Sequence, residues 1–256
     1  MDALVVQDLS VQYGGFRAVD AVSLTVQNGT VQGLIGPNGA GKTSLFNAIC
    51  GYVRSRKGRV LVYGEVVNPG SPYLAWKAGI ARTFQQAELF WTLTAREHLD
   101  LARRKAVRRR QDPPSTADLI ELVGLSDIAD QTVATLPLGS MRLVELGRAL
   151  ATGSSLLLMD EPCSGLDRAE TTQFEQVLRS VQVGLSLTLL IVEHDMEFVL
   201  SIAERILVLD SGRIIADGTP DEVMSNTAVH EAYLGVVHRD DASDGRPVND
   251  SLGASR

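Results

Sequence analysis

Apolar residues in this chain fall into short continuous runs, and several segments between these runs show helical spacing. Short apolar runs bounded by glycine or polar residues are typical of buried strands. They cover residues 3–13, 22–26, 31–35, 156–159, 187–192 and 206–209. Helical segments are expected at residues 42–50, 169–181 and 196–203. Because strands that alternate with helices build parallel sheets covered on both faces, we predict an α/β fold with a mixed, mainly parallel sheet.

The pattern differs near the N-terminus, in the middle and at the C-terminus. Runs at residues 59–63 and 66–67 flank Gly64 as in a hairpin, and we expect an antiparallel β portion in this first part of the chain. Residues 93–150 are mostly helical, which we interpret as a helical subdomain inserted at about residues 88–152 of a single domain, 1–238. The polar segment 239–256 is predicted to be disordered.

Composition and charge narrow the possible functions. The chain has 256 residues and a formal net charge of −7, and an acidic protein repels nucleic-acid phosphates, so we expect no nucleic-acid partner. Two widely separated cysteines, Cys50 and Cys163, give no disulfide framework. With no secretory leader expected, they favour a reducing compartment. No stretch approaches the roughly 18 apolar residues of a membrane span, so any membrane role should be peripheral, through a partner.

A glycine-rich segment lies between a predicted strand and a predicted helix. It reads Gly36, Pro37, Asn38, Gly39, Ala40, Gly41, Lys42, Thr43 and Ser44, which matches G-x-x-x-x-G-K-[ST]. The glycines allow successive backbone N–H groups to face one anion, and the start of the helix adds a positive dipole end. We expect Lys42 to reach the β- and γ-phosphates of a nucleotide and Thr43 to hold Mg²⁺ through its hydroxyl.

A second acidic feature follows the apolar run at residues 156–159. Asp160 and Glu161 come directly after this predicted strand, and the carboxyl ends of parallel strands are where ligands bind in open α/β folds. Asp160 would complete the Mg²⁺ shell, directly or through water. Glu161 would then face the γ-phosphate and polarise an attacking water.

With these motifs in this order, the chain resembles the ATP-binding cassette ATPases over about residues 4–235. The resemblance implies an adenine-stacking aromatic at Tyr13 and a γ-phosphate contact at His194. It also implies that Gln85 senses Mg²⁺ and the γ-phosphate and couples to a membrane subunit, with Gln86 as the alternative. In the loop of Ser164, Gly165, Leu166 and Asp167, the resemblance puts Asp167 at a dimer seam. The implied cofactors are ATP and Mg²⁺.

A narrower resemblance connects the chain with the family's importers of branched-chain amino acids. These carry T-F-Q, a compact L-P-x-G-x-x-R segment, E-H-D-M, and a G-T-P ending near A-Y-L-G. The matching residues are Thr83 to Gln85, Leu136 to Arg142, Glu193 to Met196, Gly218 to Pro220 and Ala232 to Gly235. We therefore expect an amino-acid importer subunit, although other subunits select the cargo.

The chain departs from the family's signature, L-S-G-G-Q, which closes on the γ-phosphate of the opposite subunit. Here the segment reads Leu136, Pro137, Leu138, Gly139 and Ser140. Pro137 offers no hydroxyl and Ser140 replaces the glutamine, but Gly139 could still contact a phosphate through its N–H at a helix start. A working subfamily variant and a weakened half-site paired with a more regular subunit both remain open. We expect Ser140→Gln to preserve ATP turnover.

The resemblance implies an ATP-hydrolysing subunit that powers a transporter at the cytoplasmic face of the cell membrane. Its expected partners are a second cassette subunit, identical or different, transmembrane permease subunits and, through the complex, an extracytoplasmic solute-binding protein. Two subunits would sandwich two ATP molecules. The alternatives are a motor for a urea, other solute or lipid transporter, and a regulatory switch without turnover, against which Glu161 and His194 argue.

Two further features carry weaker expectations. A basic cluster contains Arg103, Arg104, Lys105, Arg108, Arg109 and Arg110. Such a cluster is usually a solvated face, but it could contact anionic lipid or an acidic permease loop. Cys163 lies two residues after Glu161, and we expect it to be structural or incidental. If Cys163 is exposed, alkylation should slow hydrolysis and ATP should protect.

Overall fold

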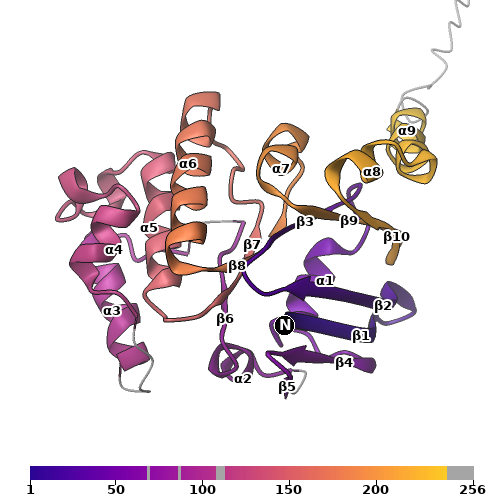
Figure 1. The fold of residues 1–256 in the computed structure, drawn as a ribbon, viewed down its shortest axis with the longest axis horizontal. Helices are drawn as coiled ribbons and strands as arrows, with labels where there is room; N and C mark the ends of the chain where they lie inside the picture. The colour runs from indigo at the N-terminus through magenta and orange to yellow at the C-terminus, as the bar shows by residue number, and fades with distance from the viewer. Residues whose placement is uncertain (68–69, 86–87, 108–112, 241–256) are drawn as a thin grey trace, which may run out of the picture.

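The computed structural model describes residues 1–67, 70–85, 88–107 and 113–240, and these contain two sheets. The larger one is six-stranded, in the order β10-β9-β3-β8-β7-β6 (Figure 1). Its strands are β3 (Val31–Ile35), β6 (Ile80–Arg82), β7 (Leu156–Asp160), β8 (Thr188–Val192), β9 (Arg205–Asp210) and β10 (Arg213–Gly218). All neighbours pair in parallel except β10, which is antiparallel to β9. The predicted mixed, mainly parallel sheet is confirmed.

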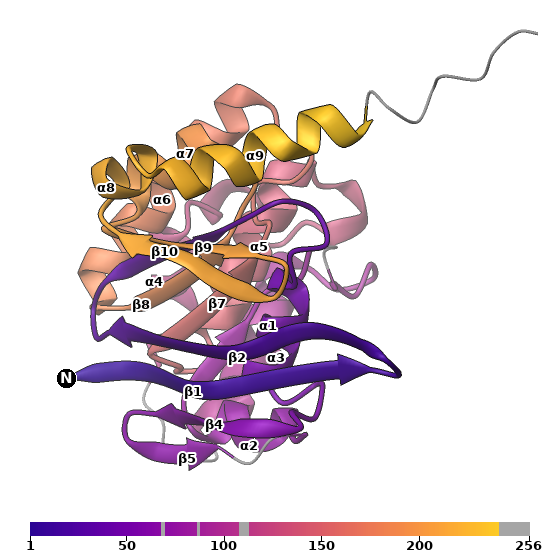
Figure 2. The ribbon, with the colours of Figure 1, turned by 90° about the vertical axis from the view of Figure 1, so that its right-hand side faces the viewer.

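The smaller sheet lies beside the first and is antiparallel throughout (Figure 2). Its order is β2-β1-β4-β5. The strands are β1 (Asp2–Tyr13), β2 (Phe16–Gln27), β4 (Lys57–Val62) and β5 (Glu65–Val67). Gly64 has a φ of 83° at the turn between β4 and β5, which favours glycine over any other residue. The predicted antiparallel portion and its hairpin are therefore confirmed.

Helices cover both faces of the parallel sheet and form a separate group at one end (Figure 1). They are α1 (Lys42–Ile49), α2 (Pro72–Lys77), α3 (Ala95–Val107), α4 (Thr116–Leu122), α5 (Leu138–Leu150), α6 (Arg168–Leu185), α7 (Met196–Ile202), α8 (Pro220–Met224) and α9 (Thr227–Asp240). Short 3₁₀ turns at Ser126–Ile128 and Val133–Thr135 join α4 to α5. Helices α3, α4 and α5 stand between β6 and β7 in the chain, where the sequence predicts the helical insert.

Alternate residues of the parallel strands face two different apolar cores. In β7, Leu156 and Leu158 pack with α1 and the antiparallel sheet, whereas Leu157 and Met159 pack with α5 and α6. All five residues of β7 are buried, as are those of β3 and β8. Because a strand that is buried on both faces reads as a continuous apolar run, this arrangement explains the runs in the sequence.

The structure adds several elements that the apolar pattern does not predict. Strand β6 has three residues and helix α2 has six, both too short to show a period. Helix α9 extends to Asp240, so the first two residues of the predicted disordered tail, 239 and 240, are helical. The rest of that tail, residues 241–256, lies outside the described residues. Among the described residues, no helix has the length and apolar character needed to cross a membrane.

Candidate functional site

The glycine-rich loop leaves β3 at the centre of the parallel sheet and enters α1. Gly36 and Gly41 have φ values of 152° and 105°. A Cβ at Gly36 would lie 2.0 Å from the Leu209 carbonyl oxygen, and one at Gly41 would lie 2.2 Å from that of Ala18. Glycine is therefore required at both positions by backbone conformation and by close approach of neighbouring chain.

Lys42, the first residue of α1, folds back over the loop. Its Nζ donates hydrogen bonds to the carbonyl oxygens of Gly36, at 2.7 Å, and Pro37, at 3.0 Å. Burial lowers the pKa of this ammonium, while the carboxylates of Asp160 and Glu161 act in the opposite direction. The loop thus holds the Lys42 cation near the acidic pair, and its predicted reach to nucleotide phosphates stays a prediction.

Asp160 ends β7 and is buried, and its partner is a residue that the sequence analysis missed. Arg82, at the end of neighbouring β6, donates from Nη2 to Asp160 Oδ2 at 2.8 Å. Both side chains are only 6% exposed. Burial raises the pKa of Asp160, and the guanidinium of Arg82 opposes that shift. The only signal for Arg82 in the sequence is its place three residues before Gln85.

Glu161 lies between two of the predicted site residues. Its Oε2 accepts a hydrogen bond from Gln85 Nε2 at 2.6 Å, and its Oε1 lies 2.7 Å from His194 Nε2. Glu161 has a left-handed backbone with a φ of 49°, and its N–H donates to the Val192 carbonyl at 2.8 Å. The ends of β6, β7 and β8 therefore bring Gln85, Glu161 and His194 together, while Gln86 lies outside the described residues.

A cavity of about 300 Å³ opens over the glycine-rich loop. It is lined by Tyr13, Phe16, Ala18, Asn38, Gly39, Ala40, Gly41, Lys42, Thr43, Ser44, Glu161 and His194. Tyr13 and Phe16 face each other across the end of the β1–β2 hairpin and are 46% and 65% exposed. The structure thus offers two aromatic rings at this cavity, and the sequence analysis named only Tyr13.

The predicted cation ligands are oxygen donors of three kinds: the Thr43 hydroxyl, the Gln85 amide and the Asp160 carboxylate. Among the described residues, no three His, Cys, Asp or Glu side chains gather as a metal-binding cluster. Mg²⁺ is usually held by one or two carboxylates together with substrate phosphates and water. The three donors are therefore of the kinds that suit Mg²⁺ bound with a nucleotide, and of these Thr43 lines the cavity over the loop.

Gly139, Ser140 and Asp167 do not line this cavity, and a second missed residue, Glu170, joins two of them. Gly139 donates its N–H to Glu170 Oε1 at 3.2 Å in the first turn of α5. Asp167 caps α6 by accepting from the Glu170 N–H at 2.9 Å, and Glu170 Oε2 accepts from the Asp167 N–H at 3.1 Å. The Gly139 N–H that the sequence assigns to a phosphate thus contacts a carboxylate in this conformation.

Arg142, also on α5, donates hydrogen bonds to backbone carbonyls near Gln85 and Glu161. It donates to the carbonyl oxygens of Phe84 (3.2 Å), Gln85 (2.7 Å) and Ser164 (3.3 Å). Its charge is paired with Glu145 at 2.9 Å, where both side chains are buried. Since this arginine belongs to the quoted L-P-x-G-x-x-R segment, its spacing is visible in the sequence although its role is not.

The structure shows how exposed Cys163 and part of the basic cluster are. Cys163 is 7% exposed and its N–H donates to buried Glu193 at 2.7 Å, so the exposure on which the alkylation test depends is not met. Burial raises the pKa of the Cys163 thiol above its ordinary value, and it raises the pKa of the Cys50 thiol to about 12. In the basic cluster, Arg104 and Lys105 are exposed on α3, and residues 108–110 lie outside the described residues.

Comparisons with known proteins agree with this geometry. A family model described as ABC transporter matches residues 19–164, and one described as branched-chain amino acid ATP-binding cassette transporter matches residues 213–239. The chain is 34% identical over 248 residues to the high-affinity branched-chain amino acid transport ATP-binding protein BraF of Pseudomonas aeruginosa, covering 91% of this chain and 97% of that protein. It is also 34% identical over 237 residues to the lipopolysaccharide export system ATP-binding protein LptB of Haemophilus influenzae, covering 92% and 98%.

A solved structure shows the same fold. It is the ADP conformation of MJ1267, an ATP-binding cassette of an ABC transporter, with a TM-score of 0.81 and 30% identity. The similarity covers 92% of this chain and 99% of that one. With the family model matching more than half of the sequence, and the phosphate loop and acidic pair at adjoining strand ends, the chain belongs to the ATP-binding cassette family and is the ATP-hydrolysing subunit of a transporter.

Proposed function

We propose that this ATPase powers the import of branched-chain or other amino acids. The C-terminal match at residues 213–239 supports this cargo, because the matching family is described by branched-chain amino acids. The similarity to BraF supports it in the same way. A lipid-export motor is the second candidate, and the 34% identity to LptB favours it.

Glu161 carries the chemistry in this proposal. Glu161 lines the cavity over the glycine-rich loop, and both of its carboxylate oxygens are engaged, by Gln85 and His194. Two partners fix the orientation of the carboxylate, so that it can accept a proton from a water attacking the γ-phosphate. His194 would contact the γ-phosphate. Gln85 would sense the γ-phosphate and couple its binding to the membrane subunit.

The phosphate loop supplies binding and charge compensation. Backbone N–H groups between Gly39 and Ser44 would face the phosphates, and Lys42 would leave its two carbonyl partners to reach the β- and γ-oxygens. Thr43, Gln85 and Asp160 would hold Mg²⁺. When bound, the ion neutralises charge that develops on the transferred phosphoryl oxygens. Tyr13, with Phe16 beside it, would stack on the base.

The proposed assembly has two cassettes and a membrane permease. Gly139, Ser140 and Asp167 would meet the nucleotide of the opposite cassette, which accounts for their position away from this chain's own cavity. Permease subunits would hold the ATPase at the cytoplasmic face of the membrane, and a solute-binding protein would deliver cargo to them.

Co-purification tests this proposal directly. A tagged Glu161→Gln variant, expected to bind ATP and turn it over slowly, would be purified from native membranes in mild detergent with ATP and Mg²⁺. Mass spectrometry should identify multi-span permeases, and uptake of labelled leucine by their reconstituted complex should require ATP. Recovery of permeases whose complex moves lipid, and not leucine, would favour the second candidate. Recovery of soluble partners alone would contradict both.

A further inference from the structure

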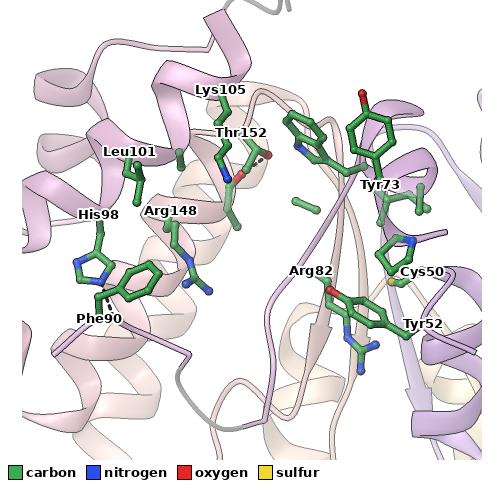
Figure 3. Close-up of a pocket in the computed structure, with 17 residues that line it drawn as sticks. Cys50, Tyr52, Tyr73, Arg82, Phe90, His98, Leu101, Lys105, Arg148 and Thr152 are labelled. Atoms are coloured by element: carbon green, nitrogen blue, oxygen red, sulfur yellow. Dashed lines mark hydrogen bonds between the residues drawn. The ribbon is translucent and has the colours of Figure 1, made fainter. Parts of the chain in front are cut away.

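A second cavity, of about 680 Å³, lies between the parallel sheet and the helical group (Figure 3). It is separate from the cavity over the glycine-rich loop. One wall is formed by α2 and β6, with Trp76 and Arg82, together with Tyr52 from the turn after α1. Helices α3 and α5 form the other wall, which carries Arg148 and His98. Figure 3 shows the Arg82 side chain next to the Tyr52 ring, on the wall facing Arg148. Arg82 is the last residue of β6, and it lines this cavity three residues before Gln85.

The guanidinium of Arg82 is held from several sides. Nη1 donates to Asn47 Oδ1 at 2.6 Å and Nη2 to Asp160 Oδ2 at 2.8 Å, so one planar group joins α1 to the end of β7. Its central carbon lies 4.8 Å from the ring centroid of Phe84 and 5.5 Å from that of Tyr52. These two rings also contact each other edge to face, at 5.7 Å.

These contacts fix the geometry of Asp160. A buried carboxylate loses its hydration, and the charged Arg82 Nη2 restores one hydrogen bond to Asp160, while Nη1, held by Asn47, limits how the guanidinium can turn. Because Arg82 engages Oδ2, it directs the other oxygen of Asp160 away from the guanidinium. Lysine would keep the charge but would lose the planar fork that binds Asn47 and Asp160 together.

We propose that Arg82 is a positioning residue for the cation site, which orients Asp160 and links it mechanically to the cavity wall at Tyr52. The inference rests on the proposed role of Asp160 in holding Mg²⁺. Residues that orient a metal ligand typically change metal affinity about 10- to 100-fold when they are replaced. The hydrogen bonds of Arg82 go to Asn47 and Asp160, outside the phosphate loop, so binding of ATP without metal should be unaffected.

The test separates metal binding from nucleotide binding. Wild type, Arg82→Lys and Arg82→Met would be compared with Arg148→Met, the same replacement at an arginine of the opposite cavity wall. The dissociation constant of a fluorescent ATP analogue would be measured with EDTA and with Mg²⁺. Binding of Mn²⁺ to the ATP-loaded protein would be followed by electron paramagnetic resonance, which does not depend on turnover.

We expect Arg82→Met to lower Mn²⁺ affinity at least about 10-fold and to remove most of the gain that Mg²⁺ gives to ATP binding, with EDTA values within about twofold of wild type. The Mn²⁺ affinity of Arg82→Lys should lie between those of wild type and Arg82→Met. Arg148→Met should match wild type in the gain that Mg²⁺ gives to ATP binding. If Arg82→Met does not fold, since it leaves a buried carboxylate unpaired, Arg82→Lys decides alone.

Two results would overturn the inference while leaving the proposed function intact: a wild-type metal response in a folded Arg82 variant, or equal losses at Arg82 and Arg148. A wild-type protein with no metal-dependent gain would instead contradict the proposed function.

A Tyr52→Ala variant tests the link between Arg82 and the cavity wall. Like Arg82→Lys, it should lower the Mn²⁺ affinity. An unchanged affinity would show that Tyr52 takes no part in positioning Arg82.

Discussion

At the scale of single residues, the backbone conformation of the glycine-rich loop constrains which residues it can contain. Gly36 and Gly39 both have positive φ, at 152° and 79°, but only Gly36 meets neighbouring backbone. Asp160 and Glu161 are adjacent in sequence and yet have opposite surroundings. Asp160 is buried against Arg82, whereas Glu161 lines the cavity over the glycine-rich loop. The sequence shows the residue types but not these surroundings.

The two glycines make a matched pair for measuring close approach. Gly36→Ala would place a Cβ 2.0 Å from the Leu209 carbonyl oxygen, whereas Gly39→Ala would meet nothing within 4 Å. We expect Gly39→Ala to cost about 1 kcal/mol from strained φ alone, and Gly36→Ala to cost clearly more. Urea unfolding of both variants measures the difference, and equal costs would show that the backbone relaxes around Gly36.

His98 should make stability depend on pH. It is buried, accepts a hydrogen bond from the Phe90 N–H at Nε2 (2.9 Å), and therefore donates from Nδ1 to the Thr94 carbonyl (2.8 Å). Burial lowers its pKa below the ordinary value of 6.5, and nearby Arg148 acts in the same direction, against Glu97. The unfolded chain thus binds the proton first, so the contribution is full above pH 6.5 and is lost as the pH falls.

A His98→Gln variant isolates this dependence, since the glutamine amide can accept from the same N–H without titrating. The free energy of unfolding should fall more steeply for wild type than for His98→Gln between pH 7 and pH 5.5. Urea titrations at these pH values provide the measurement. Parallel curves would mean that His98 does not titrate differently in the folded state.

At the scale of elements, strand ends and helix starts assemble the site. The buried strands β3, β7 and β8 were predicted because their apolar runs are continuous. The phosphate loop follows β3, Asp160 ends β7, and His194 comes two residues after β8. Strand β6 was not predicted, because three residues give no period, and Arg82 was missed with it. Glu170 was missed because its hydrogen bond with Gly139 joins α6 to α5 across 31 residues of sequence.

The start of α5 provides a test at this scale. Ser140 is half-buried in the first turn, and Gly139 is held by Glu170 and not by Ser140. We therefore expect Ser140→Gln to keep ATP turnover within about twofold, because the helix start retains its N–H groups. Steady-state ATPase assays provide the comparison, and a large loss of turnover would show that serine has a specialised role in this segment.

For the whole molecule, the sequence predicts the layered α/β fold. It also places the phosphate loop and the acidic pair at one edge of the sheet, because both follow buried apolar runs and parallel strands bring their carboxyl ends together. Tyr13, Gln85 and His194 were expected only from the family resemblance. Contacts between elements, such as those of Arg82, Arg142 and Glu170, could not be predicted because they depend on packing between distant segments. The helical group stands beside the sheet, with the larger cavity between them (Figures 1 and 3).

The most direct test of the account is ATP hydrolysis by purified wild type and Glu161→Gln, with ATP binding measured on the same samples. The account predicts Mg²⁺-dependent turnover by wild type and a loss of about 100-fold or more in the variant, because a positioned general base typically contributes 10²- to 10⁴-fold. ATP binding by the variant should remain within about twofold, since its phosphate loop is unchanged. Equal turnover by the two proteins would contradict the central role of Glu161.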